Sequence, residues 1–141
     1  MGSTGLERGF GVVVGTVLVV LGLAGSFGNP IVGAPGEAML VTGAGHDLMH
    51  LVAGALYIHV GLVLSGRHRA NALVILGAVF VVSGVVSLLG PELFGFYGAP
   101  ASPLDQLGHV AIGAASIVVG WMGRMGPARQ PRRRASRPVR G

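Results

Sequence analysis

The sequence predicts an all-α integral membrane protein, a four-helix bundle built from two parallel two-helix repeats. Of the 141 residues, 51% are hydrophobic and only 11% are charged, and the mean hydropathy is +0.71. An ordinary soluble domain is about a quarter charged. The apolar residues form four runs, each about long enough to cross a hydrocarbon core of roughly 30 Å as a helix. The first pair of runs also resembles the second pair, which predicts a repeat about an axis along the membrane normal.

The runs divide the chain into a leader, a transmembrane domain and a tail. The leader is residues 1–9, and the transmembrane domain is residues 10–123. Its four spans are expected at about residues 10–27, 47–64, 72–89 and 105–122. The segment 66–69, Gly-Arg-His-Arg, is expected to be a tight turn between the second and third spans. Residues 124–141 carry seven of the ten basic residues and little apolar surface, so this tail is predicted to be disordered.

The positions of the arginines predict the orientation. Arg67 and Arg69 lie between the second and third spans and the basic tail follows the fourth, whereas the two longer loops carry Glu37 and Glu92. The positive-inside rule therefore puts both termini in the cytoplasm. The arginine-rich tail is expected to bind anionic lipid head groups rather than nucleic acid. All ten basic residues are arginine rather than lysine, and Ala, Gly and Val are abundant, which is typical of a GC-rich bacterial genome. We therefore expect a bacterial cytoplasmic membrane as the location and allow for a membrane-protein partner.

The internal repeat depends on two matches. Glycines and valines of the first span recur in the third at a constant offset, for example Gly15 at Gly77 and Gly22 at Gly84. The second and fourth spans share Leu-x-His-x-x-x-Gly-Ala. Glycines seven residues apart lie on one helix face, where they allow close helix packing in lipid. The first span could instead be a cleaved signal peptide, but its loss would leave the third span without its counterpart.

The shared motif places titratable side chains near the outer ends of two spans. His46 and His50 are four residues apart and share a helix face, and His109 is the matching histidine of the fourth span. Asp47 and Asp105 precede His50 and His109 by three and four residues. All five could bind zinc or another divalent metal. Alternatively, His50 and His109 could ligate haem on facing helices, or Asp47 and the histidines, with His59 deeper in the span, could pass protons or ions.

The same residues also have a structural interpretation, which the sequence favours. Ser102, Pro103 and Asp105 resemble a helix start, with serine as N-cap and an acid in the first turn. Polar side chains also join helices to one another within membrane bundles. The sequence has no phosphate-binding glycine loop and no recognisable catalytic arrangement, so we expect no enzymatic activity. The chain is then a structural or accessory membrane component without a cofactor.

The paired pattern resembles a known protein family. A glycine-rich span, a Pro-containing loop and His-Asp-Leu-Met-His-Leu-Val-Ala-Gly are followed by a second copy with Leu-Gly-His-Val-Ala-Ile-Gly. This is similar to a domain-of-unknown-function family of small four-helix bacterial membrane proteins, over roughly residues 9–123. The resemblance implies a fold and a membrane location. His50 and His109 match the family's histidine positions, and Asp47 and Asp105 match its polar position loosely, without any assigned activity.

Overall fold

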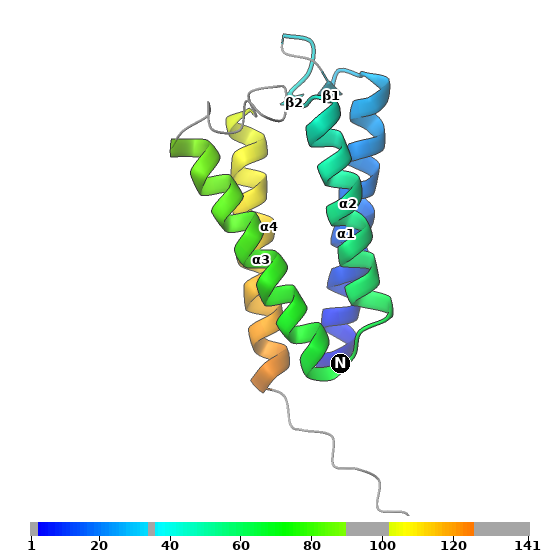
Figure 1. Cartoon of the computed structure of the whole chain (residues 1–141), viewed down its shortest axis with the longest axis vertical. Coiled ribbons are helices and arrows are strands. Elements are labelled where there is room, and N and C mark those ends of the chain that lie inside the picture. Colours follow the sequence, from blue (N-terminus) through cyan, green and yellow to red (C-terminus); the bar gives the residue numbers. More distant parts are fainter. Residues whose placement is uncertain (1–2, 34–35, 90–101, 126–141) are drawn as a thin grey trace, which may run out of the picture.

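The described part of the chain folds as four helices with one small pair of strands. The structure is a computed structural model that describes residues 3–33, 36–89 and 102–125. Its elements are α1 (Ser3–Phe27), β1 (Val32–Gly33), β2 (Leu40–Val41), α2 (Ala44–Leu62), α3 (Gly66–Leu89) and α4 (Pro103–Met125) (Figure 1). The two strands pair in parallel, Val32 with Leu40. The predicted all-helical class is confirmed, and most of the predicted tail lies outside the described residues.

Three of the helices are long and apolar enough to cross a membrane. The apolar segments are Gly5–Phe27, Gly66–Leu89 and Pro103–Met125. The second predicted span, which corresponds to α2, is not among them. Its 19 residues include His46, Asp47, His50 and His59, which lower its hydropathy. Three of the described helices are therefore compatible with a membrane protein, and α2, which carries His46 and His50, is not one of the three.

The helices extend beyond the predicted spans. α1 begins at Ser3, so most of the predicted leader is helical. The expectation of a turn at residues 66–69 is wrong, because the chain reverses at residues 63–65 and α3 begins at Gly66. Gly66 has φ +53°, a conformation that glycine adopts without a steric penalty. Arg69, one turn into α3, donates hydrogen bonds to the carbonyl oxygens of Val60 and Leu64 and so satisfies the end of α2.

The four helices form two hairpins, and glycine lies at the closest approach within each. α1 packs along α2, and α3 packs along α4 (Figure 1). A Cβ atom at Gly15 would lie 2.6 Å from the carbonyl oxygen of Gly54, and one at Gly77 would lie 2.6 Å from that of Gly113. Only glycine allows backbones to approach so closely. The hairpins come together at the end that holds the N-terminus and separate towards the end that holds β1 and β2 (Figure 1).

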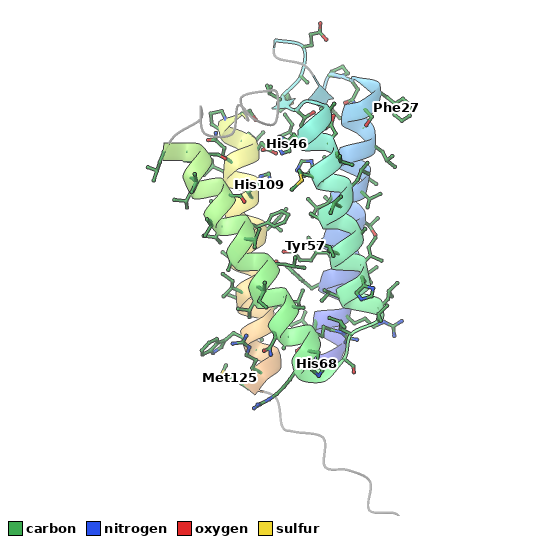
Figure 2. All side chains as sticks on the ribbon, in the orientation of Figure 1. Phe27, His46, Tyr57, His68, His109 and Met125 are labelled. Atoms are coloured by element: carbon green, nitrogen blue, oxygen red, sulfur yellow. The ribbon has the colours of Figure 1, made fainter. Side chains whose placement is uncertain are left out.

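The interior between the hairpins is small and partly polar, whereas the exterior is apolar. Tyr57, Phe80 and Leu18 belong to the buried core, and Tyr57 lies between the two hairpins (Figure 2). The Tyr57 hydroxyl donates to Oγ of Ser116 at 2.7 Å, because Ser116 itself donates to a carbonyl oxygen of its own helix. Large apolar side chains are exposed along every helix. Such a surface is suited to lipid rather than to water.

Candidate metal centre

The candidate site lies between the two hairpins, where they separate. The first turns of α2 bring His46 and His50 to its inner face, and the first turns of α4 bring Asp105 and His109 there. The two residues on each helix are four positions apart, so they point in one direction. Four of the five predicted metal ligands are therefore together, and each helix contributes two of them.

Each helix start is fixed locally. α4 starts as the sequence predicts, since Oγ of Ser102 accepts a hydrogen bond from the backbone N–H of Asp105 at 3.2 Å. α2 starts after Gly43, without a side-chain cap, and has Asp47 in its first turn. A carboxylate in the first helical turn is stabilised by the helix dipole. Asp105 and Asp47 therefore both favour a helix start, but only Asp105 also faces the site.

The three imidazole rings form a triangle. The ring centroids of His46 and His50 are 4.5 Å apart, and the ring of His109 is 5.6 Å from each of them. Phe80 from α3 stacks on His109 at 5.2 Å and limits its rotation. The triangle is buried at His50 and partly buried at the other two corners. The rings thus surround a point near the mouth of the bundle.

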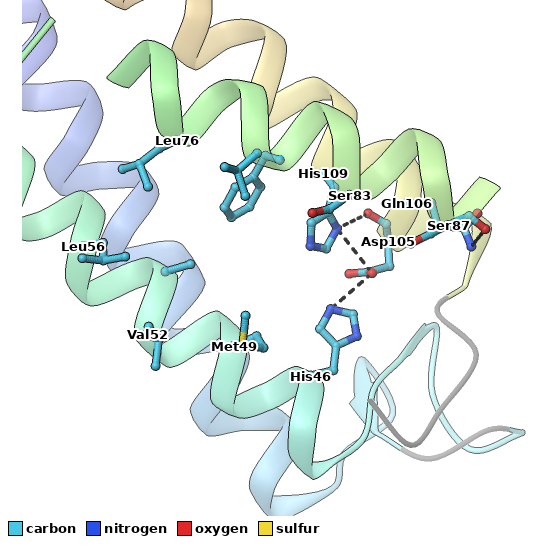
Figure 3. Close-up of a pocket in the computed structure, with 13 residues that line it drawn as sticks. His46, Met49, Val52, Leu56, Leu76, Ser83, Ser87, Asp105, Gln106 and His109 are labelled. Atoms are coloured by element: carbon cyan, nitrogen blue, oxygen red, sulfur yellow. Dashed lines mark hydrogen bonds and ion pairs between the residues drawn. The ribbon is translucent and has the colours of Figure 1, made fainter. Parts of the chain in front are cut away.

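Asp105 bridges two of the imidazoles. Its Oδ2 atom is 3.4 Å from Nε2 of His46 and 3.4 Å from Nδ1 of His109 (Figure 3). Nδ1 of His109 also donates to the backbone carbonyl oxygen of Asp105 at 2.9 Å. A donor bond from Nδ1 leaves Nε2 of the same ring with a free lone pair. His109 is therefore held in the tautomer that can bind a metal through Nε2.

Two donor atoms of the cluster have no hydrogen-bond partner among the described residues. They are Nδ1 of His50 and Oδ2 of Asp105, and both are buried; the contacts of Oδ2 with the two imidazoles, at 3.4 Å, are ion pairs rather than hydrogen bonds. Buried polar atoms are nearly always paired, because an unpaired one costs about 1–3 kcal/mol. In the described part of the chain, atoms of Glu7, Thr42, Asp47 and Arg124 outside the cluster also lack a hydrogen bond, so it is the presence of two such atoms in one cluster that suits an ion or a water molecule.

The donor atoms are close enough to share one ion. One ligand atom from each of His46, His50, Asp105 and His109 lies within 4.8 Å of all the others. In a tetrahedral zinc site the ligand atoms are 2.0–2.2 Å from the ion and therefore about 3.3–3.6 Å from one another. The four side chains would have to move closer together, by up to about 1.5 Å, to share an ion. Imidazole and carboxylate ligands suit zinc and related divalent metals.

Asp47 and His59 lie elsewhere. Asp47 is buried but faces α1, where its carboxylate packs against the Cα of Gly25. His59 is exposed. Between the cluster and the opposite end of the bundle lie Leu18 and Phe80, which are apolar and buried. The structure therefore brings together four of the five predicted metal ligands and separates Asp47 and His59 from them.

The sequence did not indicate that Phe80 contacts the site, or that Asp105 is the residue equivalent to His46. Asp47 was matched with Asp105, but His46 and Asp105 both precede a motif histidine by four residues. The equal spacing of four was available in the sequence and indicates that these two residues occupy equivalent positions. No sequence signal distinguished Phe80 from the other apolar residues of α3.

Comparison with protein-family models, curated proteins and solved structures finds no match for this chain. The resemblance to the four-helix family stays a prediction. Within residues 3–33, 36–89 and 102–125, the fold and the site define an all-helical protein with three helices suited to the membrane and one cluster of three histidines and an aspartate.

Proposed function

We propose that the protein is a multi-pass membrane protein that binds one divalent transition metal, most suitably zinc, through His46, His50, Asp105 and His109. The observation that carries the proposal is that one ligand atom from each residue lies within 4.8 Å of the others. Three imidazoles and a carboxylate are common zinc ligands. Since two ligands come from each hairpin, the metal joins the hairpins where they otherwise separate.

A four-span topology follows if α1 and α3 both cross the membrane. α2 connects the end of α1 to the start of α3 and packs along α1, so it must cover the same thickness. Its 19 residues give a length of about 28 Å at 1.5 Å per residue, close to the hydrocarbon thickness. His46 and His50 of α2 point into the bundle and so avoid the lipid, whereas His59 near the end of the helix is exposed. The arginines then place both termini in the bacterial cytoplasm and the metal near the outer face.

The equivalent positions of the two hairpins support an internal repeat. Gly15 approaches Gly54 as Gly77 approaches Gly113. Gly77 follows Gly15 by 62 residues and Gly113 follows Gly54 by 59, and these two offsets relate the helices of the first hairpin to those of the second. With the same offsets, three of the pairs that meet between the hairpins are equivalent residues: His50 with His109, His46 with Asp105 and Tyr57 with Ser116. Contacts between equivalent residues are expected around a two-fold axis. We propose that this axis passes through the metal site.

The geometry favours a single ion over haem. The rings of His50 and His109 are nearly parallel, at 21°, and their centroids are 5.6 Å apart. Two axial ligands point their nitrogens at an iron from opposite faces of a macrocycle, which needs a slot between them. Here His46 and Asp105 lie beside the same rings and fill that space.

A purely structural role accounts less well for the cluster. A histidine that only joins helices is expected to donate and accept hydrogen bonds within the bundle. His50 leaves its buried Nδ1 without a hydrogen-bond partner among the described residues. Proton passage is also less well supported, because Leu18 and Phe80 separate the cluster from the cytoplasmic end.

Metal titration of the purified protein tests the proposal. We expect the full-length chain in detergent to bind one zinc ion, and His50→Ala to weaken binding at least about 100-fold, since it removes a direct ligand. His59→Ala is the matched control, because this exposed histidine of the same helix lies outside the cluster. Equal zinc affinity of the His50→Ala, His59→Ala and unaltered proteins would refute the metal site. A haem absorption band that is lost in His50→Ala would replace zinc by haem.

A further inference from the structure

A cavity adjoins the metal site on the side between α2 and α3. Its volume is about 210 Å³. An apolar cavity of about 150 Å³ is enough to bind benzene. One end is polar and is lined by His46, Asp105 and His109, and the other end is lined by apolar side chains (Figure 3). The cavity is therefore large enough for part of a small molecule that has one polar and one apolar end.

The rim of the cavity is apolar and exposed. Val52 and Leu56 of α2 line it and are 48% and 47% exposed, and Val79 of α3 is 55% exposed. If these helices cross the membrane, the rim contacts lipid chains rather than water. A ligand then enters sideways from the bilayer, between α2 and α3. From His46 to Leu56 the cavity extends ten residues along α2, which is about 15 Å.

The polar end selects the charge of the ligand. Asp105 is the one acidic residue among the cavity-lining residues. With neutral imidazoles, a divalent ion and one carboxylate leave a net charge of +1 in a buried place. A buried charge requires a counter-charge. A ligand with a single negative charge and an oxygen donor meets this requirement and suits zinc.

We propose that the cavity binds a long-chain monocarboxylate, such as a fatty acid, with its carboxylate on the metal and its chain along the groove between α2 and α3. This inference rests on the proposed metal site. In this arrangement the fatty-acid carboxylate is a fifth ligand beside His46, His50, Asp105 and His109, since zinc can accept five ligands. Asp105, which is 3.4 Å from two of the imidazoles, orients those rings.

Cobalt substitution separates the two proposals. The full-length chain is placed in phosphatidylcholine nanodiscs and titrated first with Co²⁺, whose visible absorption depends on its ligands, and then with decanoate. We expect decanoate to change the cobalt spectrum at concentrations about tenfold or more below those that acetate requires, because acetate has no chain to bury. Decan-1-ol, which lacks the carboxylate, is expected to leave the spectrum unchanged.

Leu56→Trp tests whether the chain occupies the cavity. Tryptophan is expected to fill the groove, to keep the Co²⁺ spectrum and to abolish the preference for decanoate over acetate. Val82→Trp is the matched control, since Val82 is 60% exposed on α3 and does not line the cavity. Val82→Trp is expected to keep the preference for decanoate, which shows that the preference depends on the cavity and not on partitioning of decanoate into the bilayer.

The outcomes are distinguishable. If Co²⁺ added to the unaltered protein gives no spectrum of a protein-bound metal, the metal site is refuted, and the fatty-acid site with it. A cobalt spectrum that decanoate does not change, or that decan-1-ol changes equally, overturns the fatty-acid site alone. A Leu56→Trp protein that keeps both its Co²⁺ spectrum and its preference for decanoate also overturns the fatty-acid site alone. If Leu56→Trp does not bind Co²⁺, the smaller change Val79→Phe takes its place.

Discussion

Gly113→Ala is expected to destabilise the bundle, although alanine forms helices better than glycine. A Cβ atom at this position would lie 2.6 Å from the carbonyl oxygen of Gly77 and 2.7 Å from the backbone nitrogen of Val81. Ordinary van der Waals contact begins at 3.4 Å, so α3 and α4 would have to separate locally by about 0.8 Å. Both neighbouring atoms belong to the backbone, and no side-chain rotation relieves the contact.

The magnitude follows from two opposing terms. Overpacking of a well-packed interior costs about 1–3 kcal/mol. Replacement of glycine by alanine within a helix gains about 0.5–1 kcal/mol. Gly108→Ala isolates the second term, because a Cβ atom at Gly108 meets nothing within 4 Å and the position lies on the same helix. Gly113→Ala is therefore expected to be about 1–3 kcal/mol less stable than Gly108→Ala.

Unfolding in mixed micelles measures this difference. The purified protein is titrated with a denaturing detergent, and the loss of helix is followed by circular dichroism. Fluorescence of Trp121, the single tryptophan of the chain, gives a second probe at the end of α4. The same free energy of unfolding for Gly113→Ala and Gly108→Ala would refute close backbone packing of α3 against α4.

Three further predictions test other contacts. Tyr57→Phe removes the hydrogen bond to Ser116 and is expected to cost about 0.5–1.5 kcal/mol in the same assay; no measurable loss would mean that this bond does not join the hairpins. Exchange of the equivalent pair, His46→Asp with Asp105→His, is expected to keep zinc affinity within about tenfold, whereas each single change weakens it. A double variant no better than the single ones would contradict the two-fold arrangement. A reporter that is active only in the periplasm, fused after Gly141, is expected to be silent, and its activity would reverse the orientation.

The features of the fold that depend on local sequence were predictable. Four apolar runs and their polar interruptions were enough to indicate four helices, because helices are the only open structures whose backbone is satisfied in lipid. Ser102 and Pro103 located the start of α4 for the same local reason. The start of α3 was not predictable from hydropathy. It depends on the positive φ of Gly66 and on hydrogen bonds from Arg69 to the end of the preceding helix.

Most residues of the candidate site were predictable from the sequence, but the contacts between them were not. The spacing of four residues put His46 and His50 on one face, and the structure brings that face to Asp105 and His109. The separation of Asp47 depends on the direction of its side chain around α2, which is set by the packing of Gly25 on α1. Asp47 lies seven residues before Gly54, so this spacing puts it on the glycine face of α2 that packs against α1.

The proposed two-fold arrangement explains why the site lies between the hairpins and contains two kinds of ligand. In a repeated hairpin, every residue near the axis meets its own equivalent, so an unchanged duplicate would place four histidines around the metal. The equivalent of His46 is Asp105, and this single difference supplies a carboxylate that lies beside two imidazoles. One charged ligand lowers the net charge of a divalent site in a buried place, where an uncompensated charge is costly. Among the four ligand positions, the one that differs between the two copies therefore supplies the single negative charge of the site.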